Sequence, residues 1–241
     1  MDVITLKNYE QLSKKAARIL AGKIELKPNS VLCLPTGGTP LGMYSRLVDY
    51  YEKENISFNK ITSFNLDEYI GIKPEHPGSF NKYMYKNLFN HIDIKEGNIY
   101  IPNGNAEDLK KECIQYEKDI SKAGGIDLLV MGIGENGHLA FLEPGDSIPA
   151  WTSVVKLSEH TRIANSSEFE NIDLVPKKAI TVGIKTILSA KEIILLASGK
   201  NKAWAVEKMI KENITPQIPA TFLKLHDRAT ILLDKAAADK I

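Results

Sequence analysis

The feature that most constrains the fold is the alternation of short apolar runs with longer amphipathic stretches. Several of the apolar runs are almost continuously apolar, which indicates burial on both faces and favours a parallel sheet. The runs expected to be strands are residues 30–35, 60–66, 126–133, 179–184, 192–198 and 229–234. Amphipathic patterns predict helices over residues 8–24, 41–54, 106–123 and 201–212. This order predicts an α/β fold: a doubly wound, mostly parallel, Rossmann-like sheet with helices on both faces.

Length and charge limit the number of domains and the kinds of partner that the chain can have. The 241 residues contain no internal repeat, low-complexity segment or long linker, so we expect a single domain over residues 1–241. A net charge of +1 without a basic arm gives no general attraction to nucleic acid or to an anionic membrane. The apolar runs are too short to span a bilayer. Cys33 and Cys113 lack Cys-x-x-Cys spacing, and the N-terminus lacks a signal-peptide pattern, so we expect a cytoplasmic protein.

In a doubly wound sheet, ligands bind at the carboxyl ends of the strands, so the loops after the strands are the candidate sites. The first such loop is Pro35–Pro40. Gly37 and Gly38 allow close approach of the backbone to a ligand, Thr39 is expected to cap the next helix, and Pro40 to occupy its first position. No Gly-Lys-Ser/Thr follows, which excludes a Walker loop. The loop predicts a phosphate cradle, with a simple strand-to-helix turn as the alternative.

The second candidate site is a pair of adjacent acidic residues. Asp67 and Glu68 follow the strand of residues 60–66 directly. A carboxylate that is partly removed from water gains proton affinity and can act as a general base. The alternatives are a solvated acidic turn or a carboxylate that caps a later element. Residues 75–80 are expected to form an ordered loop that leads into a helix near Ser79 and could cover the site.

The third loop contains a formal match to a dinucleotide-binding fingerprint. Gly132, Gly134 and Gly137 fit the pattern G-x-G-x-x-G after an apolar run. That fingerprint requires a helix after its third glycine, because the helix N-terminus holds the pyrophosphate. Pro144 and Pro149 follow too soon for such a helix, so we do not expect a dinucleotide site.

The same loop carries a candidate proton-transfer group. His138 lies between Asn136 and Glu143, and histidine titrates near neutral pH. A nearby carboxylate can orient the ring and favour its charged form. The alternative is a loop histidine that bonds only to backbone. The five histidines show no paired ligand spacing and no His-Glu-x-x-His motif occurs, so no metal site is expected.

Five motifs in this order carry a family resemblance. They are LPTGGTP at 34–40, FNLDEY at 64–69, GIGENGHLAFLEPG at 132–145, HTRIANS at 160–166 and SGKNKA at 198–203. Together they resemble the glucosamine-6-phosphate deaminase (isomerase) family over nearly the whole chain. The resemblance implies a Rossmann-like fold and a hydrolase that needs no cofactor. Such a hydrolase would convert glucosamine 6-phosphate and water into fructose 6-phosphate and ammonium.

The resemblance also implies roles for individual residues. Asp67 would take the proton from carbon 2 of the open-chain sugar and return it to carbon 1. His138 would help to open the pyranose ring, supported by Glu143. The residues implied to hold the phosphate are Gly37, Gly38, Thr39, Arg162 and Lys202.

Several positions depart from the family pattern. Asn136 stands where many members carry an aspartate, so the catalytic group would be a His–Glu pair with an amide. Leu142 stands where asparagine is common, and this suggests galactosamine 6-phosphate as an alternative substrate. Ser153 and Val155 replace the basic pair of the allosteric members, which implies the short, non-allosteric type.

Two other functions remain as alternatives. A 6-phosphogluconolactonase has a related fold and also uses a loop histidine, but FNLDEY with NGHLAFLEPG fits a deaminase better. A non-catalytic sugar-phosphate sensor would tend to lose its acid–base residues, whereas Asp67, His138 and Glu143 are all present. The expected partner is a small amino-sugar phosphate, bound by a monomer or a small homo-oligomer.

Overall fold

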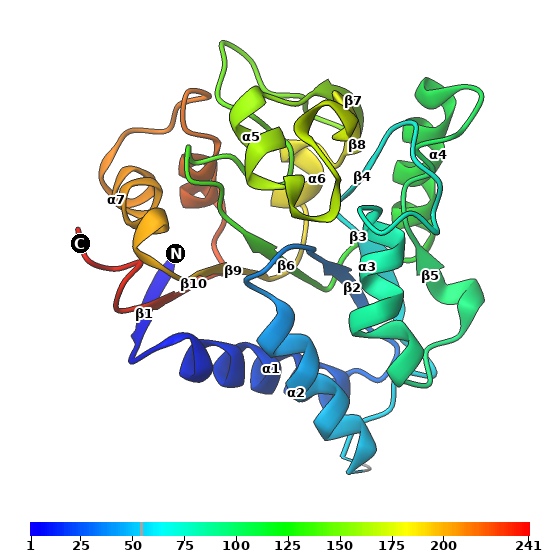
Figure 1. Ribbon diagram of the computed structural model, residues 1–241. Helices are drawn as coiled ribbons and strands as arrows, with labels where there is room; N and C mark the ends of the chain where they lie inside the picture. The colour runs from blue at the N-terminus through cyan, green and yellow to red at the C-terminus, as the bar shows by residue number, and fades with distance from the viewer. Residues whose placement is uncertain (54) are drawn as a thin grey trace.

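A seven-stranded parallel sheet forms the centre of the computed structural model, which describes residues 1–53 and 55–241 (Figure 1). The strand order is β1-β10-β9-β6-β2-β3-β5. The strands are β1 (Asp2–Leu6), β2 (Val31–Leu34), β3 (Thr62–Asn65), β5 (Ile99–Tyr100), β6 (Leu128–Gly132), β9 (Ile193–Ala197) and β10 (Ala229–Asp234). The helices are α1 (Tyr9–Leu26), α2 (Leu41–Glu52), α3 (Phe80–Asn87), α4 (Leu109–Lys122), α5 (Glu159–Ala164), α6 (Ile184–Leu188) and α7 (Ala203–Lys211). The predicted doubly wound α/β fold is confirmed.

The near-continuous apolar runs are explained by two cores, one on each face of the sheet. Alternate residues of a strand point to opposite faces. In β2, Leu32 packs with α1 and α2, whereas Cys33 faces the core formed with α4, α6 and α7. Leu129 and Val130 of β6 divide in the same way. Both faces of the sheet are therefore buried, as is usual for a parallel sheet.

A second, smaller sheet corrects part of the sequence interpretation. It contains β4 (Asp67–Tyr69), β8 (Lys178–Thr181) and β7 (Ser153–Lys156), paired antiparallel. The run at 179–184 was expected in the main sheet, and Asp67 and Glu68 in a loop; both expectations were wrong. Only Leu66 separates β3 from β4. The chain does not form a loop after β3, because the backbone of β4 pairs with β8. In Figure 1, β7 and β8 lie above the main sheet, with α1 and α2 below it.

The start of α2 also differs from expectation. Thr39 does not cap this helix: Pro40 occupies the cap position, and its side chain makes no cap hydrogen bond. Instead, the amide of Gly42 donates to the hydroxyl of Tyr9 at 2.8 Å, so a residue of α1 satisfies the first turn. A helix was expected over residues 41–54. In the structure it ends at Glu52, and residue 54 lies outside the described residues. None of the helices described here has the length and apolar composition needed to cross a membrane.

An ion cluster fixes the opposite, amino-terminal end of the strands. The buried carboxylate of Asp127 accepts hydrogen bonds from Lys27 at 2.5 Å, from Lys191 at 2.7 Å and from the amide of Val31 at 2.9 Å. Burial alone would raise the pKa of Asp127, but the hydrogen bonds from Lys191, Lys27 and Val31 outweigh it and lower the pKa to about 2.

Asp127→Asn should therefore reduce the free energy of unfolding at pH 7 by about 1–3 kcal/mol, because charge-assisted bonds are lost. Since the folded-state pKa of Asp127 lies below its ordinary value, its contribution is complete above about pH 4 and disappears as the pH falls towards 2. Urea unfolding at several pH values measures the free energy of unfolding of the variant and of the wild type. The difference between the two free energies should become smaller as the pH falls from about 4 to 2. Glu10→Gln, which breaks only an exposed pair with Arg46, is the control and should cost less than about 1 kcal/mol. A difference that stays constant from pH 7 to pH 2 would contradict the assignment.

Candidate active site

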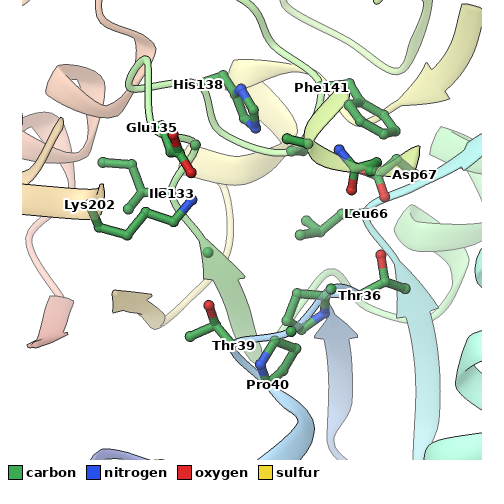
Figure 2. A pocket seen from close by; sticks show the side chains of 18 of the residues that line it. Thr36, Thr39, Pro40, Leu66, Asp67, Ile133, Glu135, His138, Phe141 and Lys202 are labelled. Carbon is green, nitrogen blue, oxygen red and sulfur yellow. The ribbon is translucent and has the colours of Figure 1, made fainter. Parts of the chain in front are cut away.

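A pocket of about 460 Å³ opens at the carboxyl ends of the central strands (Figure 2). It lies where the strand order reverses, between β2 and β6, which is the usual ligand site of a doubly wound sheet. The loops after β2 and β6 reach it, and so do Leu66 and Asp67, which follow β3. Its lining includes Tyr9, Thr36, Gly37, Gly38, Thr39, Asp67, Phe80, Gly134, Glu135, His138, Ala140, Phe141, His160, Asn165, Asn201 and Lys202. In the described part of the chain, no His/Cys/Asp/Glu cluster that could hold a metal ion is found.

The Gly/Thr loop after β2 is held from outside by two tyrosines. Tyr83 of α3 donates its hydroxyl proton to the carbonyl of Gly37 at 2.6 Å, and Tyr9 of α1 donates to that of Gly38 at 3.3 Å. Gly37 has a φ of 97°, a backbone conformation that favours glycine. The loop with Thr39 is therefore fixed against the pocket by two helices before any ligand binds.

Asp67 lies on one wall of the pocket with 6% of its surface exposed. Among the described residues, none donates a hydrogen bond to its carboxylate. Burial, and then the charge of neighbouring Glu68, raise the pKa of Asp67 well above its ordinary value. A carboxylate with a raised pKa binds a proton more strongly, as general-base chemistry requires.

A histidine and a carboxylate lie side by side on another wall. The distance from His138 Nδ1 to Glu143 Oε2 is 3.7 Å, close enough for an ion pair but too long for a hydrogen bond. Asn136 connects the two: its amide donates to Glu143 Oε2 at 2.9 Å, and its Oδ1 accepts from the backbone amide of His138 at 3.2 Å. Burial alone would raise the pKa of Glu143, but contacts with His138, Thr161 and Asn136 lower it to about 2. Glu143 is therefore ionised at neutral pH.

The glycines of the third loop make room for this histidine. A Cβ atom on Gly134 would lie 2.3 Å from the ring of His138. Gly137 has a φ of 85°, and after it the chain forms a tight turn bridged by Leu139 and Leu142 rather than a helix. The loop therefore lacks the helix N-terminus that a dinucleotide fingerprint needs, as expected from its prolines.

The cation of the pocket lies on the wall opposite Asp67. Figure 2 shows the ammonium of Lys202 directed towards the carboxylate of Glu135, across the cavity from Asp67. Burial lowers the pKa of Lys202, and the charge of Glu135 opposes that shift. Glu135 also accepts from Asn201 at 2.6 Å and lies 3.9 Å from His160. An anion bound here would therefore meet a half-buried ammonium that has already lost part of its water.

Sequence reasoning missed Glu135 and His160 as pocket residues. Both lie inside the five family motifs, since Glu135 is within GIGENGHLAFLEPG and His160 begins HTRIANS. Their position next to the motif residues was the available signal. Their contact with each other depends on α5 lying beside the loop after β6, which only the fold reveals.

Arg162 is not brought into the pocket. Its guanidinium donates to the carbonyls of Val175 at 3.1 Å and Ile172 at 2.5 Å, and it lines a separate hollow with Lys156 and Lys178. Arg162 lies on the side of α5 that faces residues 172–175. In this structure the guanidinium holds the backbone of residues 172–175, and a contact of Arg162 with the phosphate stays a prediction.

Leu142 is also not part of the pocket lining. Only 1% of its surface is exposed, and it packs in the core with Leu139 and Val182. A direct effect of this side chain on the choice of substrate is therefore not supported. The side chain that fills the neighbouring pocket wall is Phe141 (Figure 2).

The fold and the pocket define an α/β protein with a buried carboxylate, a histidine–carboxylate pair and a lysine around one ligand site. Residues 7–232 match the family described as glucosamine-6-phosphate isomerases/6-phosphogluconolactonase, and the chain belongs to this family. It is 54% identical to a glucosamine-6-phosphate deaminase from Thermoanaerobacter sp. (strain X514), over 100% of this chain and 95% of that protein. It is 50% identical to one from Clostridium botulinum (strain Loch Maree), over 100% and 99% of the two chains.

Solved structures of other proteins have the same fold as this chain. A structure described as a monomeric glucosamine-6-phosphate deaminase superposes with a TM-score of 0.97 at 49% identity, and all of both chains is covered. The 6-phosphogluconolactonase from Trypanosoma cruzi has a TM-score of 0.79 at 22% identity, over 100% of this chain and 96% of that one. The latter likeness shows the shared fold alone.

Gly134→Ala should displace the ring of His138, because the new methyl group would overlap it. A displacement of about 1 Å at a reacting group can cost about a hundredfold in rate, so we expect kcat/KM to fall by about tenfold to a hundredfold. Steady-state kinetics measure this, and thermal unfolding tests whether the fold is kept. Gly97→Ala is the matched control, since a Cβ atom there meets nothing within 4 Å and Gly97 is not part of the pocket lining. Unchanged kinetics in Gly134→Ala would show that the ring position is not required.

Proposed function

We propose that this protein is a glucosamine-6-phosphate deaminase that converts glucosamine 6-phosphate and water into fructose 6-phosphate and ammonium. The observation that carries the proposal is the buried carboxylate of Asp67, to which no described residue donates a hydrogen bond, in a pocket whose opposite wall presents Lys202. The names of relatives that are about half identical to this chain over its full length support the same activity. The enzyme is then a hydrolase that acts on a carbon–nitrogen bond with isomerisation.

The phosphate is proposed to bind at the Lys202 end of the pocket. Gly37, Gly38 and Thr39 would contribute polar groups from a loop that two tyrosines hold in place, and Lys202 would contribute the charge. A phosphate dianion at this site would stabilise the charged form of the half-buried ammonium. With the phosphate held there, carbons 1 and 2 of an extended sugar would reach the opposite wall, where Asp67 lies.

The proton transfers follow from the roles implied by the family. His138 would assist opening of the pyranose ring to the free aldehyde. Asp67 would then remove the proton from carbon 2, which gives an enolamine, and return it to carbon 1, which leaves an imine at carbon 2. Water adds to that imine and ammonium departs, which yields the ketose. One base can serve both carbons because they are adjacent and the phosphate fixes the chain.

Glu143 and Asn136 are proposed to support His138. The ionised carboxylate of Glu143 lies 3.7 Å from Nδ1 of the ring and would help to orient it. Asn136 fixes the carboxylate through one hydrogen bond and the loop backbone through another. An amide can perform both tasks without adding a second negative charge.

Galactosamine 6-phosphate remains the alternative substrate, and lactone hydrolysis the alternative reaction within the family. The two sugars differ only in the orientation of the hydroxyl at carbon 4. We further propose that residues 1–241 act as a single cytoplasmic domain, as a monomer or small homo-oligomer; the solved relative is itself described as monomeric.

Asp67→Asn should abolish turnover and leave substrate binding largely intact, because an amide keeps the shape of the carboxylate but cannot accept the proton. Loss of a general base costs about a hundredfold or more. Ammonium release from glucosamine 6-phosphate measures the rate, with galactosamine 6-phosphate and the gluconolactone assayed in parallel. A wild type that hydrolyses only the lactone refutes the deaminase, and an Asp67→Asn variant with most of its activity refutes the choice of base.

Lys202→Gln should raise KM by about tenfold or more, because a charge-assisted contact to phosphate contributes about 1.5–3 kcal/mol. Arg162→Gln is the comparison: its contacts are with backbone carbonyls, so the variant should unfold at a lower temperature while KM stays near the wild-type value. Steady-state kinetics and thermal unfolding of both variants separate the two roles. If KM rises in Arg162→Gln alone, the phosphate site is misplaced.

A further inference from the structure

Glu68 is a buried acid that lies next to Asp67 and has no part in the chemistry proposed above. Only 5% of its surface is exposed, yet both of its carboxylate oxygens are fully used. Oε1 accepts from the amides of Tyr69 at 2.8 Å and Phe80 at 3.0 Å. Oε2 accepts from the amide of Asn81 at 2.8 Å and from the hydroxyl of Ser79 at 2.9 Å. Every contact is made as an acceptor, which is the pattern of an ionised carboxylate.

These contacts join two elements that are separate in the fold. The amides of Phe80 and Asn81 belong to the first turn of α3, where backbone N–H groups lack partners within the helix. The Ser79 hydroxyl, which donates to Glu68, also accepts from Lys82 as the helix cap. The amide of Tyr69 belongs to β4. Glu68 therefore clamps β4 to the start of α3.

The clamp reaches the pocket from both sides. Through β4 it fixes the strand that carries Asp67. Through α3 it places Phe80 on the pocket wall, stacked with Phe141 at a centroid distance of 5.8 Å, and it supports Tyr83, whose hydroxyl holds the Gly37 carbonyl. The base and the anion loop are thus tied to the same helix.

We infer that Glu68 is a positioning residue for the reaction proposed above: its carboxylate clamps β4 onto α3 and thereby fixes Asp67 and Phe80 around the substrate. The inference rests on the proposed function for its kinetic readout. A glutamate is required because each oxygen accepts from a backbone amide. The amide nitrogen of a glutamine would have to face one of these N–H groups, which leaves a buried donor unsatisfied.

Burial raises the pKa of Glu68, and its four hydrogen bonds oppose that shift by stabilising the charged form, which is the form that would act on the neighbouring base. The groups that face Asp67 from other elements are Cys33 of β2, Tyr116 of α4 and Thr181 of β8, with His138 across the pocket. Burial raises the pKa of both Cys33 and Tyr116, so neither is charged at neutral pH. Glu68 is the neighbour whose charge adds to burial in raising the pKa of Asp67. Since Asp67 must be ionised to act as a base, removal of the Glu68 charge should extend activity to lower pH.

The test compares Glu68→Gln, Ser79→Ala and Glu75→Gln by the pH dependence of kcat and kcat/KM for ammonium release. Glu68→Gln should lower kcat by about tenfold or more and move the acid limb of kcat/KM to lower pH. Ser79→Ala removes one contact and keeps the charge, so kcat should fall by a smaller factor and the acid limb should stay in place. Glu75→Gln removes an exposed acid from the neighbouring loop and should match the wild type.

Each outcome decides the inference. A Glu68→Gln variant with wild-type kcat and an unmoved acid limb overturns it, and so does a loss of activity equal to that of Ser79→Ala with no shift of the acid limb. If Glu68→Gln does not fold, Ser79→Ala decides: a reduced kcat with unchanged KM supports the clamp, and an unchanged kcat overturns it. If the wild type releases no ammonium, the proposed function fails. Carboxyl NMR titration of Asp67 in Glu68→Gln then tests the clamp alone, with a lowered midpoint expected and an unchanged midpoint overturning it.

Discussion

The parallel hydrogen bonding of β2 with β6 is the constraint on which the rest of the site depends. It aligns Leu32 and Cys33 with Leu128 and Leu129, so both strands end at the same edge of the sheet. From this pair the connections run outwards in opposite directions, to β3 and β5 on one side and to β9, β10 and β1 on the other. Because the connections diverge there, the carboxyl ends of β2 and β6 leave a crevice between them. The pocket therefore lies between the Gly/Thr loop and the loop that carries His138.

The charges of the site are arranged so that each one has a restricted position. Glu143 is held by Asn136 and Ser158, and Glu68 by the first turn of α3. Asp67, between these groups, has no donor among the described residues and is left with an elevated pKa. Hydrogen bonds stabilise the ionised form of a carboxylate, so their unequal distribution separates acids that support the site from an acid suited to take up a proton.

Much of this arrangement could be predicted from sequence because it depends on local patterns. The strands after which the loops occur, the helix that begins at Ser79 and the absence of a helix after Gly137 all follow from apolar runs, caps and prolines. The assignment of Arg162 to the phosphate could not be checked locally, since the direction of its side chain depends on how residues 172–175 fold against α5. The same holds for Leu142, whose burial follows from the tight turn between Leu139 and Leu142. The cap of α2 was mispredicted because a tyrosine from another helix replaced the neighbouring threonine.

The sequence by itself determined the fold class, the family motifs and the residue types available for chemistry, because periodicity and turn chemistry are short-range properties. Only the tertiary structure decided which of these residues meet. It turned the Asp67–Glu68 pair from a loop into a strand of a second sheet, so that the two carboxylates lie in different surroundings. Asp67 faces the pocket, and Glu68 faces the backbone of α3. Adjacent residues of a strand point in opposite directions, and only the pairing of that strand with β8 shows which direction leads to the site.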